Sequence, residues 1–222
     1  MKAIIFDLDD TLYPEREFVM SGFKVVAKYL AKKYALNQFK IFNFLRFDFK
    51  NGIRGKNFDL LIARFNLSKK ELKSLIKIYR NHKPKIKLYP DAKKILKYLA
   101  KNKKIKIGLI SDGAVKTQTN KLQSLKIDKI FDAIVLSDSF GKKYRKPHLR
   151  PFHLALKKLK IKPEEAIYVA DNPLKDFIGA GKLGIFTVRI KRKNGIYNDI
   201  QEIKKNRSNL IIFNLLQLRN LC

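Results

Sequence analysis

Short apolar runs alternate with helical segments along most of this chain, and this alternation limits the folds that it can adopt. The runs occupy residues 3–6, 105–110, 133–136, 166–170, 185–190 and 210–213. Most segments between them place apolar residues three or four positions apart, as an amphipathic helix does. Short continuous apolar strands separated by helices are typical of a parallel sheet that is buried on both faces. The sequence therefore predicts an α/β fold with about six strands.

Polar side chains directly follow three of these runs. Asp7 and Asp9 follow the first run, Ser111 follows the second, and Asp171 follows the fourth. Taken alone, the acids after the first run are explained about equally well by a metal site and by a structural role as turn residues or acids at a helix start. In a Rossmann-like parallel sheet with helices on both faces, however, ligands bind at the carboxyl ends of the strands. Polar groups at three separate strand ends therefore predict a functional site along that edge.

A helical block interrupts the alternation between the first and second strands. Residues 15–85 contain no credible strand, and helices are expected near 18–34, 39–49, 56–65 and 69–80. Ser68 followed by Glu71 forms a capping-box pattern at the start of the last of these helices. Because the block lies between two strands of one sheet, it is predicted to be an insertion. Residues 1–14 and 87–222 then form the core domain, and residues 15–86 form the inserted domain.

Composition excludes several classes of protein. Hydrophobic residues make up 45% of the 222 positions, which is enough for a substantial core and argues against disorder. No apolar run approaches the roughly 20 residues that span a bilayer, and acids follow Met1 too soon for a signal peptide. Cys222 is the single cysteine, so an internal disulfide is impossible. These features predict a cytoplasmic protein without a membrane partner.

The formal net charge of +31 raises the possibility of binding to nucleic acid or another polyanion. The basic residues are mostly lysines and are spread along the whole chain, and no zinc-finger, leucine-zipper or aromatic RNA-binding pattern accompanies them. The abundance of Lys, Ile, Asn, Phe and Leu also matches the AT-rich codons. A solvated basic surface is therefore the favoured interpretation, and no specific nucleic-acid partner is expected.

The acid cluster after the first strand suits phosphoryl chemistry. Asp7 can attack an electrophilic phosphorus to form an aspartyl-phosphate. Asp9, two residues later, can protonate the leaving oxygen and then deprotonate water. Thr11 can brace the turn by hydrogen bonding, although a helix-cap role explains it equally well. Asp10 is interpreted as local structure only.

A carboxylate nucleophile needs positive charge and hydrogen-bond donors before it can approach a phosphate. Mg²⁺ can bridge the nucleophile and a phosphate oxygen, with Asp171 as a further ligand. Ser111 and the backbone N–H groups of Asp112 and Gly113 can bind phosphate oxygens at the start of a helix. Lys146 can supply a fixed positive charge, although a surface position is the default for one lysine among so many.

These motifs resemble those of the haloacid dehalogenase-like superfamily, in the usual order and over nearly the whole chain. The four segments are FDLDDTL, LISDG, RKPHLRPF and VADNPLKD, with matches at Asp7, Asp9, Thr11, Ser111, Lys146, Asp171 and Asp176. The resemblance implies that Asp7 is the nucleophile, that Asp9 is the acid/base and that its main-chain carbonyl is a metal ligand. It also implies that Asp171 binds Mg²⁺ directly and that Asp176 supports the site. The helical insertion is similar to the C1 cap of this superfamily, which closes over the substrate.

The resemblance also limits which reactions of this superfamily the chain is expected to catalyse. The pair Asp10-Thr11 is similar to phosphatase members, whereas mutase members typically carry Gly-Val at that place, and true dehalogenases lack the acid that Asp171 supplies. Ala170, where many members have Gly, is expected to have little effect. We therefore expect a Mg²⁺-dependent phosphatase, monomeric or homodimeric, that acts on a small phosphorylated metabolite such as a sugar phosphate or phosphoglycolate. The alternatives are a phosphomutase of the same family and a non-catalytic polyanion-binding protein on this scaffold.

Overall fold

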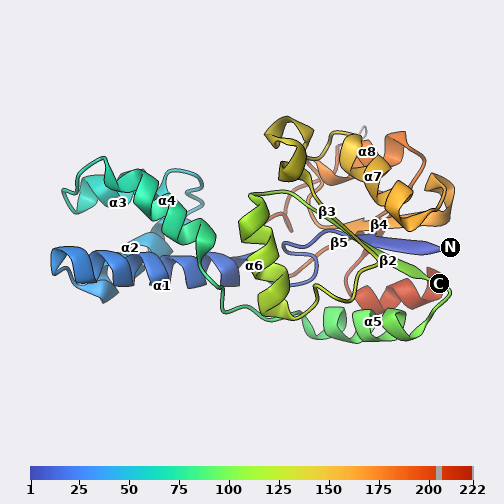
Figure 1. Cartoon of the computed structure of the whole chain (residues 1–222), viewed down its shortest axis with the longest axis horizontal. Helices are drawn as coiled ribbons and strands as arrows, with labels where there is room; N and C mark the ends of the chain where they lie inside the picture. Colours follow the sequence, from blue (N-terminus) through green and yellow to red (C-terminus); the bar gives the residue numbers. More distant parts are fainter. Residues whose placement is uncertain (204–206, 222) are drawn as a thin grey trace. The chain divides into compact units, whose positions relative to one another are not determined.

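The computed structural model describes residues 1–203 and 207–221, so Cys222 lies outside the described residues. The chain forms two compact units (Figure 1). One unit contains residues 1–15 together with the chain from Ile86 onward, and the other contains Arg16–Lys85. No helix within the described part of the chain has both the length and the hydropathy needed to cross a bilayer.

A six-stranded parallel sheet forms the centre of the first unit. Its strands are β1 (Ala3–Phe6), β2 (Lys106–Ser111), β3 (Ala133–Leu136), β4 (Ala166–Ala170), β5 (Phe186–Ile190) and β6 (Leu210–Ile212). They lie in the order β3-β2-β1-β4-β5-β6, and every pairing is parallel. Because β1 lies between β2 and β4, the three strands that end in predicted site residues are neighbours. The predicted Rossmann-like α/β fold, with an all-helical insertion after the first strand, is confirmed.

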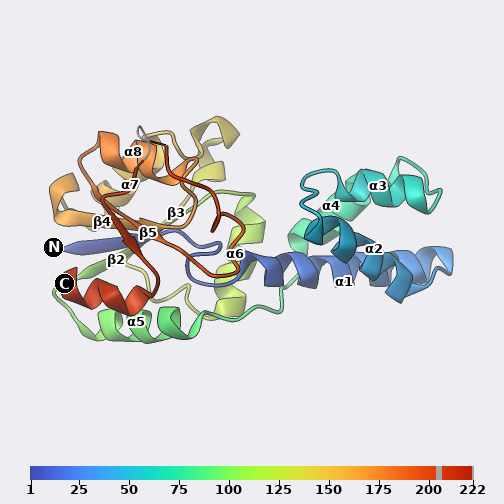
Figure 2. The ribbon, with the colours of Figure 1, turned by 180° about the vertical axis from the view of Figure 1, so that it is seen from behind.

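Helices cover both faces of this sheet. They are α5 (Pro90–Lys101), α6 (Val115–Leu125), α7 (Arg150–Leu159) and α8 (Asp176–Lys182), with 3₁₀ segments η1 (Ser137–Phe140), η2 (Lys142–Tyr144), η3 (Pro163–Glu165) and η5 (Leu215–Leu221). In Figures 1 and 2, α7 and α8 lie on one face, whereas α5 and η5 lie on the other. The last helical segment of the described chain, η5, is a 3₁₀ helix rather than an α-helix. All four residues of β1 are fully buried, as expected for a central strand.

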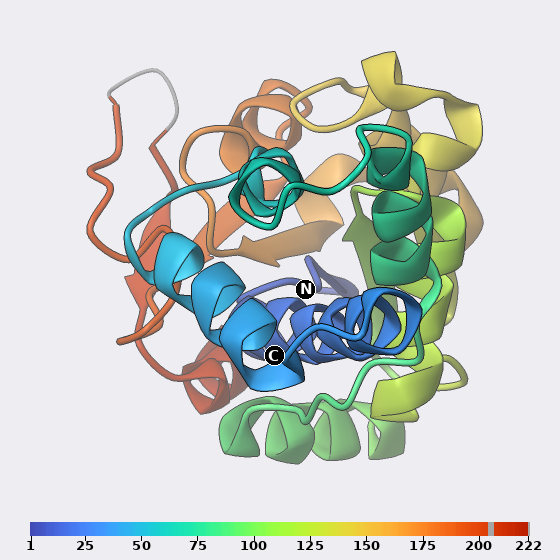
Figure 3. The same ribbon diagram turned by 90° about the vertical axis from the view of Figure 1, so that its left-hand side faces the viewer.

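Four helices make up the second unit, which begins one residue after the start of its first helix. They are α1 (Glu15–Tyr34), α2 (Gln38–Lys50), α3 (Asn57–Arg64) and α4 (Glu71–Asn81). Figure 3 shows α1 nearly end-on, with α2 and α4 on different sides of it. Buried residues such as Phe23, Leu45 and Leu75 give this unit a hydrophobic core of its own.

The predicted capping box at the start of α4 is wrong. The helix begins at Glu71 itself, so Ser68 lies outside the N-cap position. The Glu71 carboxylate accepts hydrogen bonds from the hydroxyls of Tyr29 and Tyr34, at 3.1 and 2.8 Å, and from Lys33 Nζ at 2.5 Å. These contacts come from α1, and they hold the carboxylate that would otherwise reach back to the helix start. A tertiary contact has therefore overridden a local capping signal.

Candidate active site

The turn after β1 is fixed by bonds from distant parts of the first unit. The backbone N–H of Asp7 donates to Val169 O at 2.9 Å and so extends the pairing of β1 with β4. Asp10 adopts a left-handed conformation with φ of 47°, and its carboxylate accepts hydrogen bonds from the backbone N–H groups of Glu15 and Ile196, each at 2.8 Å. Because Ile196 is far away in the sequence, the prediction that Asp10 serves only local structure is wrong.

Arg192 holds the same turn from a second direction. Its guanidinium donates to the main-chain carbonyl of Thr11 at 2.6 Å and pairs with Asp91 at 2.7 Å. The Thr11 side chain is fully buried, and within the described chain its hydroxyl makes no hydrogen bond. Neither bracing by the Thr11 hydroxyl nor helix capping is therefore seen in the protein alone. The arginine supplies the observed bracing.

Lys146 is a buried cation at the centre of the site, so the surface interpretation of this lysine is wrong. Its side chain is fully buried, and its ammonium forms ion pairs with Asp7 and, at 2.8 Å, with Asp176. It also lies 3.0 Å from the hydroxyl of Tyr168 on β4. Burial acts to lower the pKa of Lys146, but the Asp176 and Asp7 carboxylates outweigh it and hold the pKa well above its usual value. The lysine therefore stays charged.

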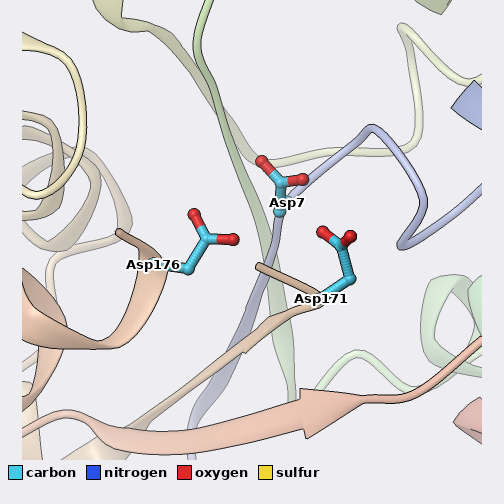
Figure 4. A group of neighbouring side chains, drawn as sticks. All are labelled: Asp7, Asp171 and Asp176. Atoms are coloured by element: carbon cyan, nitrogen blue, oxygen red, sulfur yellow. The ribbon is translucent and has the colours of Figure 1, made fainter. Parts of the chain in front are cut away.

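Three buried carboxylates come together beside this lysine. Asp7 at the end of β1, Asp171 at the end of β4 and Asp176 at the start of α8 point toward a common space (Figure 4). One oxygen from each lies within 4.8 Å of the others. Burial raises the pKa of Asp7 to about 7 against the pull of Lys146, and burial with the nearby Asp176 and Asp7 raises the pKa of Asp171 well above its usual value.

The donor set fits a hard divalent cation. All three side chains offer oxygen, which is the ligand that Mg²⁺ prefers. Asp171 is only 7% exposed, and among residues 1–203 and 207–221 its carboxylate has no hydrogen-bond or ion-pair partner. A buried, unpartnered carboxylate is costly unless a positive charge balances it. Asp7 and Asp171 are therefore suited to hold a metal, with Asp176 shared between the metal site and Lys146.

The end of β2 supplies the predicted phosphate-binding segment. Ser111 is 1% exposed, and its hydroxyl has no hydrogen-bond partner among the described residues. Gly113 has φ of 126°, and its N–H makes a long, 3.4 Å contact with Asp138. The Asp112 carboxylate instead pairs with Lys175 Nζ at 2.8 Å. Burial acts to raise the pKa of Asp112, but nearby lysines outweigh it and hold the pKa below its usual value.

The Asp9 side chain contacts two residues that lie outside the predicted site, Tyr13 and Lys121. The hydroxyl of Tyr13 donates to Asp9 Oδ1, and Lys121 Nζ lies 2.6 Å from the same oxygen. The side chain of Lys121 is only 4% exposed, although the residue lies in α6 and belongs to none of the recognised motifs. Nothing in the local sequence pairs residue 121 with residue 9, because the contact joins α6 to the turn after β1, and these two segments are far apart in the chain.

A cavity of about 340 Å³ joins these groups. The predicted residues that line it are Asp7, Asp9, Asp112, Gly113, Lys146, Asp171 and Asp176. The lining residues that were not predicted are Glu15, Gln118, Lys121, Arg145, Asn172, Lys175 and Tyr197. A signal existed for three of them, since Arg145 lies within the quoted segment RKPHLRPF and Asn172 and Lys175 lie within VADNPLKD.

The parallel sheet and the acid-lysine cluster at its carboxyl edge define a hydrolase class. The family model described as haloacid dehalogenase-like hydrolase matches residues 4–190, which is most of the chain. The chain therefore belongs to the haloacid dehalogenase-like hydrolase family, and the resemblance predicted from the four motifs is confirmed.

Relatives within the family share most of their length with this chain. A glyceraldehyde 3-phosphate phosphatase of Methanocaldococcus jannaschii is 37% identical over 210 residues, covering 91% of this chain and 89% of the relative. A protein of the same name from Pyrococcus furiosus is 32% identical, and the match covers 98% of this chain and 91% of the relative. The crystal structure of a phosphatase of this family from Thermococcus onnurineus matches with a TM-score of 0.65 at 25% identity, covering 100% of this chain and 97% of that chain.

Proposed function

We propose that this hydrolase is a Mg²⁺-dependent phosphatase that hydrolyses a small phosphate monoester through an aspartyl-phosphate on Asp7. The observation that carries the proposal is the cluster of Asp7, Asp171 and Asp176 around the buried ammonium of Lys146. The names of the similar proteins from M. jannaschii and P. furiosus support a triose phosphate as the first substrate to test.

The proposed reaction has two steps. In the first, a carboxylate oxygen of Asp7 forms a bond to phosphorus while the bond to the ester oxygen breaks, and Asp9 gives that oxygen its proton. In the second, Asp9 takes a proton from water, the water oxygen bonds to phosphorus, and the bond to Asp7 breaks. The products are the alcohol and inorganic phosphate, and both aspartates return to their starting states.

The remaining site residues would bind and neutralise the phosphoryl group. The hydroxyl of Ser111 and the N–H groups of Asp112 and Gly113 would donate to its oxygens, and Lys146 would balance its charge. Mg²⁺ held by Asp7, Asp171 and the main-chain carbonyl of Asp9 would withdraw charge from the phosphate. Asp176 would keep both the metal site and Lys146 in place.

The inserted helical unit, residues 15–86, is proposed to act as a cap that determines which ester is accepted. This part of the proposal rests on the resemblance to capped family members, and the helical unit has its own core. A chimaera that carries the insertion of a family member with a different substrate tests it. Substrate preference should follow the insertion, and a preference that stays with the core domain would contradict a cap role.

A phosphometabolite panel tests the activity directly. The purified protein is assayed with glyceraldehyde 3-phosphate, phosphoglycolate, hexose phosphates and p-nitrophenyl phosphate, with and without Mg²⁺, by release of inorganic phosphate. Asp7→Asn should lower kcat by more than about 1,000-fold. Lys116→Met changes an exposed lysine and serves as the matched control. Turnover that survives Asp7→Asn, or that needs no divalent metal, would contradict the proposal.

A further inference from the structure

Helix α6 buries an unusually polar face. Its buried residues include Thr117, Gln118, Asn120 and Lys121, with Leu122 and Leu125 completing the face. A helix that covers a sheet normally buries an apolar stripe, because burying polar groups carries a free-energy penalty unless they are paired. Two residues of this face, Gln118 and Lys121, line the cavity, so the face takes part in the site.

Lys121 is the charged member of this face. The residue is 3% exposed, and its ammonium lies 2.6 Å from Asp9 Oδ1. The Tyr13 hydroxyl donates to the same oxygen, and Lys121 Nζ lies 5.9 Å from the centre of the Tyr13 ring. Among the described residues, both hydrogen bonds to the Asp9 carboxylate fall on Oδ1. The second carboxylate oxygen therefore remains for exchange of a proton.

We infer that Lys121 and Tyr13 form a positioning pair that fixes the carboxylate of Asp9 for proton transfer. The inference rests on the proposed phosphatase function, in which Asp9 is the acid/base. An aspartate side chain that is held by one donor can still rotate, whereas donors from α6 and from the turn after β1 hold the same oxygen from two directions. Hydrogen bonds that involve charged groups are the stronger ones, so the lysine should dominate.

The kinetic consequence follows from where these residues act. The proposed mechanism gives neither side chain a contact with the phosphoryl group, so removing either should leave KM within about threefold. The proton transfer, in contrast, depends on the placement of Asp9, and a displacement of about 1 Å lowers rates by up to about 100-fold. Lys121→Met should therefore lower kcat about 10- to 100-fold. Lys121→Arg, which keeps the charge and a donor, should recover at least part of that loss.

The test is a double-mutant cycle on kcat with p-nitrophenyl phosphate and glyceraldehyde 3-phosphate. The variants are Lys121→Met, Lys121→Arg, Asp9→Asn, the double variant Lys121→Met/Asp9→Asn, and Lys116→Met on the exposed face of the same helix as control. If Lys121 acts through Asp9, the double variant should be no slower than Asp9→Asn alone. Fully additive losses, an unchanged kcat in Lys121→Met, or a loss that appears only in KM would overturn the inference.

Tyr13→Phe keeps the test decisive if Lys121→Met fails to fold, because it removes only the hydroxyl. Its kcat should fall several-fold with KM unchanged. An unchanged kcat would overturn the inference that Tyr13 and Lys121 together position Asp9. The proposed function is tested separately. A wild-type protein that hydrolyses no phosphate ester would refute both the phosphatase function and the positioning role. An active wild type with a normal Lys121→Met variant would refute only the positioning role.

Discussion

At the scale of single residues, Lys146 is the group on which the acid cluster depends most. It lies against Asp7 and Asp176 with its side chain fully buried. Without it, the cluster of Asp7, Asp171 and Asp176 would lose the cation that pairs directly with two of its members. Breaking a buried ion pair by removing one partner is strongly destabilising, because the partner's charge stays buried and unpaired.

Lys146→Met should therefore lower the free energy of unfolding of the metal-free protein at neutral pH by about 3–5 kcal/mol. The loss should be smaller near pH 5, because burial raises the pKa of Asp7 to about 7 and that carboxyl is then protonated. Urea unfolding at the two pH values measures both effects, with Lys116→Met expected to stay within about 0.5 kcal/mol of wild type. An equal loss at both pH values would show that packing rather than charge is responsible.

At the scale of elements, Glu71 links α4 to α1 inside the helical unit. The hydrogen bond from Lys33, with further bonds from Tyr34 and Tyr29, lowers the pKa of the Glu71 carboxyl. A carboxyl with a lowered pKa in the folded state adds stability above its unfolded pKa of about 4.3, and the addition is lost as pH falls through the folded value. Acid should therefore weaken the pairing of these two helices.

Glu71→Gln should lower the thermal unfolding midpoint by about 2–4 °C at neutral pH, with the difference disappearing in acid below the lowered pKa. The exposed acid Asp59 on α3 provides the control variant Asp59→Asn, which should behave as wild type at every pH. Calorimetry or circular dichroism across the acidic range measures the midpoints. A difference between Glu71→Gln and wild type that persists in acid would mean that the charge of Glu71 is irrelevant.

The same elements show what the sequence could and could not predict. Strand ends were predictable because Asp7, Ser111 and Asp171 each follow a buried apolar run, and parallel strands place these ends on one edge. The roles of Glu71 and Lys121 were not predictable from the sequence, because each depends on a side chain about 40 or more residues away in the sequence. Local signals fix where helices and strands form, whereas these contacts depend on how the elements pack.

At the scale of the whole molecule, a chain with a net charge of +31 is proposed to bind anionic substrates. Long-range attraction raises the encounter rate of a charged ligand and is screened by salt. If the proposed function holds, kcat/KM for a phosphate ester should fall about three- to tenfold between about 50 and about 500 mM salt, with kcat nearly constant. Stopped-flow or steady-state assays with p-nitrophenyl phosphate measure it.

The same salt series separates the enzyme from a polyanion-binding protein. A DNA duplex should bind weakly and be lost as salt rises, because non-specific binding comes from counterion release. Binding that survives about 500 mM salt and discriminates between sequences would require contacts beyond charge, and would favour the polyanion alternative. A kcat/KM that does not change with salt would mean that the positive charge has no influence on encounter.

Metal binding should reverse the pH dependence that the acid cluster creates in the metal-free protein. Burial raises the pKa of Asp7 from 3.8 to about 7, so the folded state holds a proton that the unfolded chain releases. The metal-free protein should therefore lose stability as pH rises from about 4 to about 7, with no further loss from this group above that range.

Mg²⁺ binds the ionised carboxylates, so it should stabilise the fold more at pH 8 than at pH 5. At about 100 times its Kd, the gain at pH 8 should be roughly 2–3 kcal/mol. Urea unfolding with and without Mg²⁺ at both pH values gives the comparison, and Asp171→Asn should abolish most of the gain because it removes a proposed ligand. If Mg²⁺ raises the free energy of unfolding of Asp171→Asn by the same amount, the metal does not bind at the cluster of Asp7, Asp171 and Asp176.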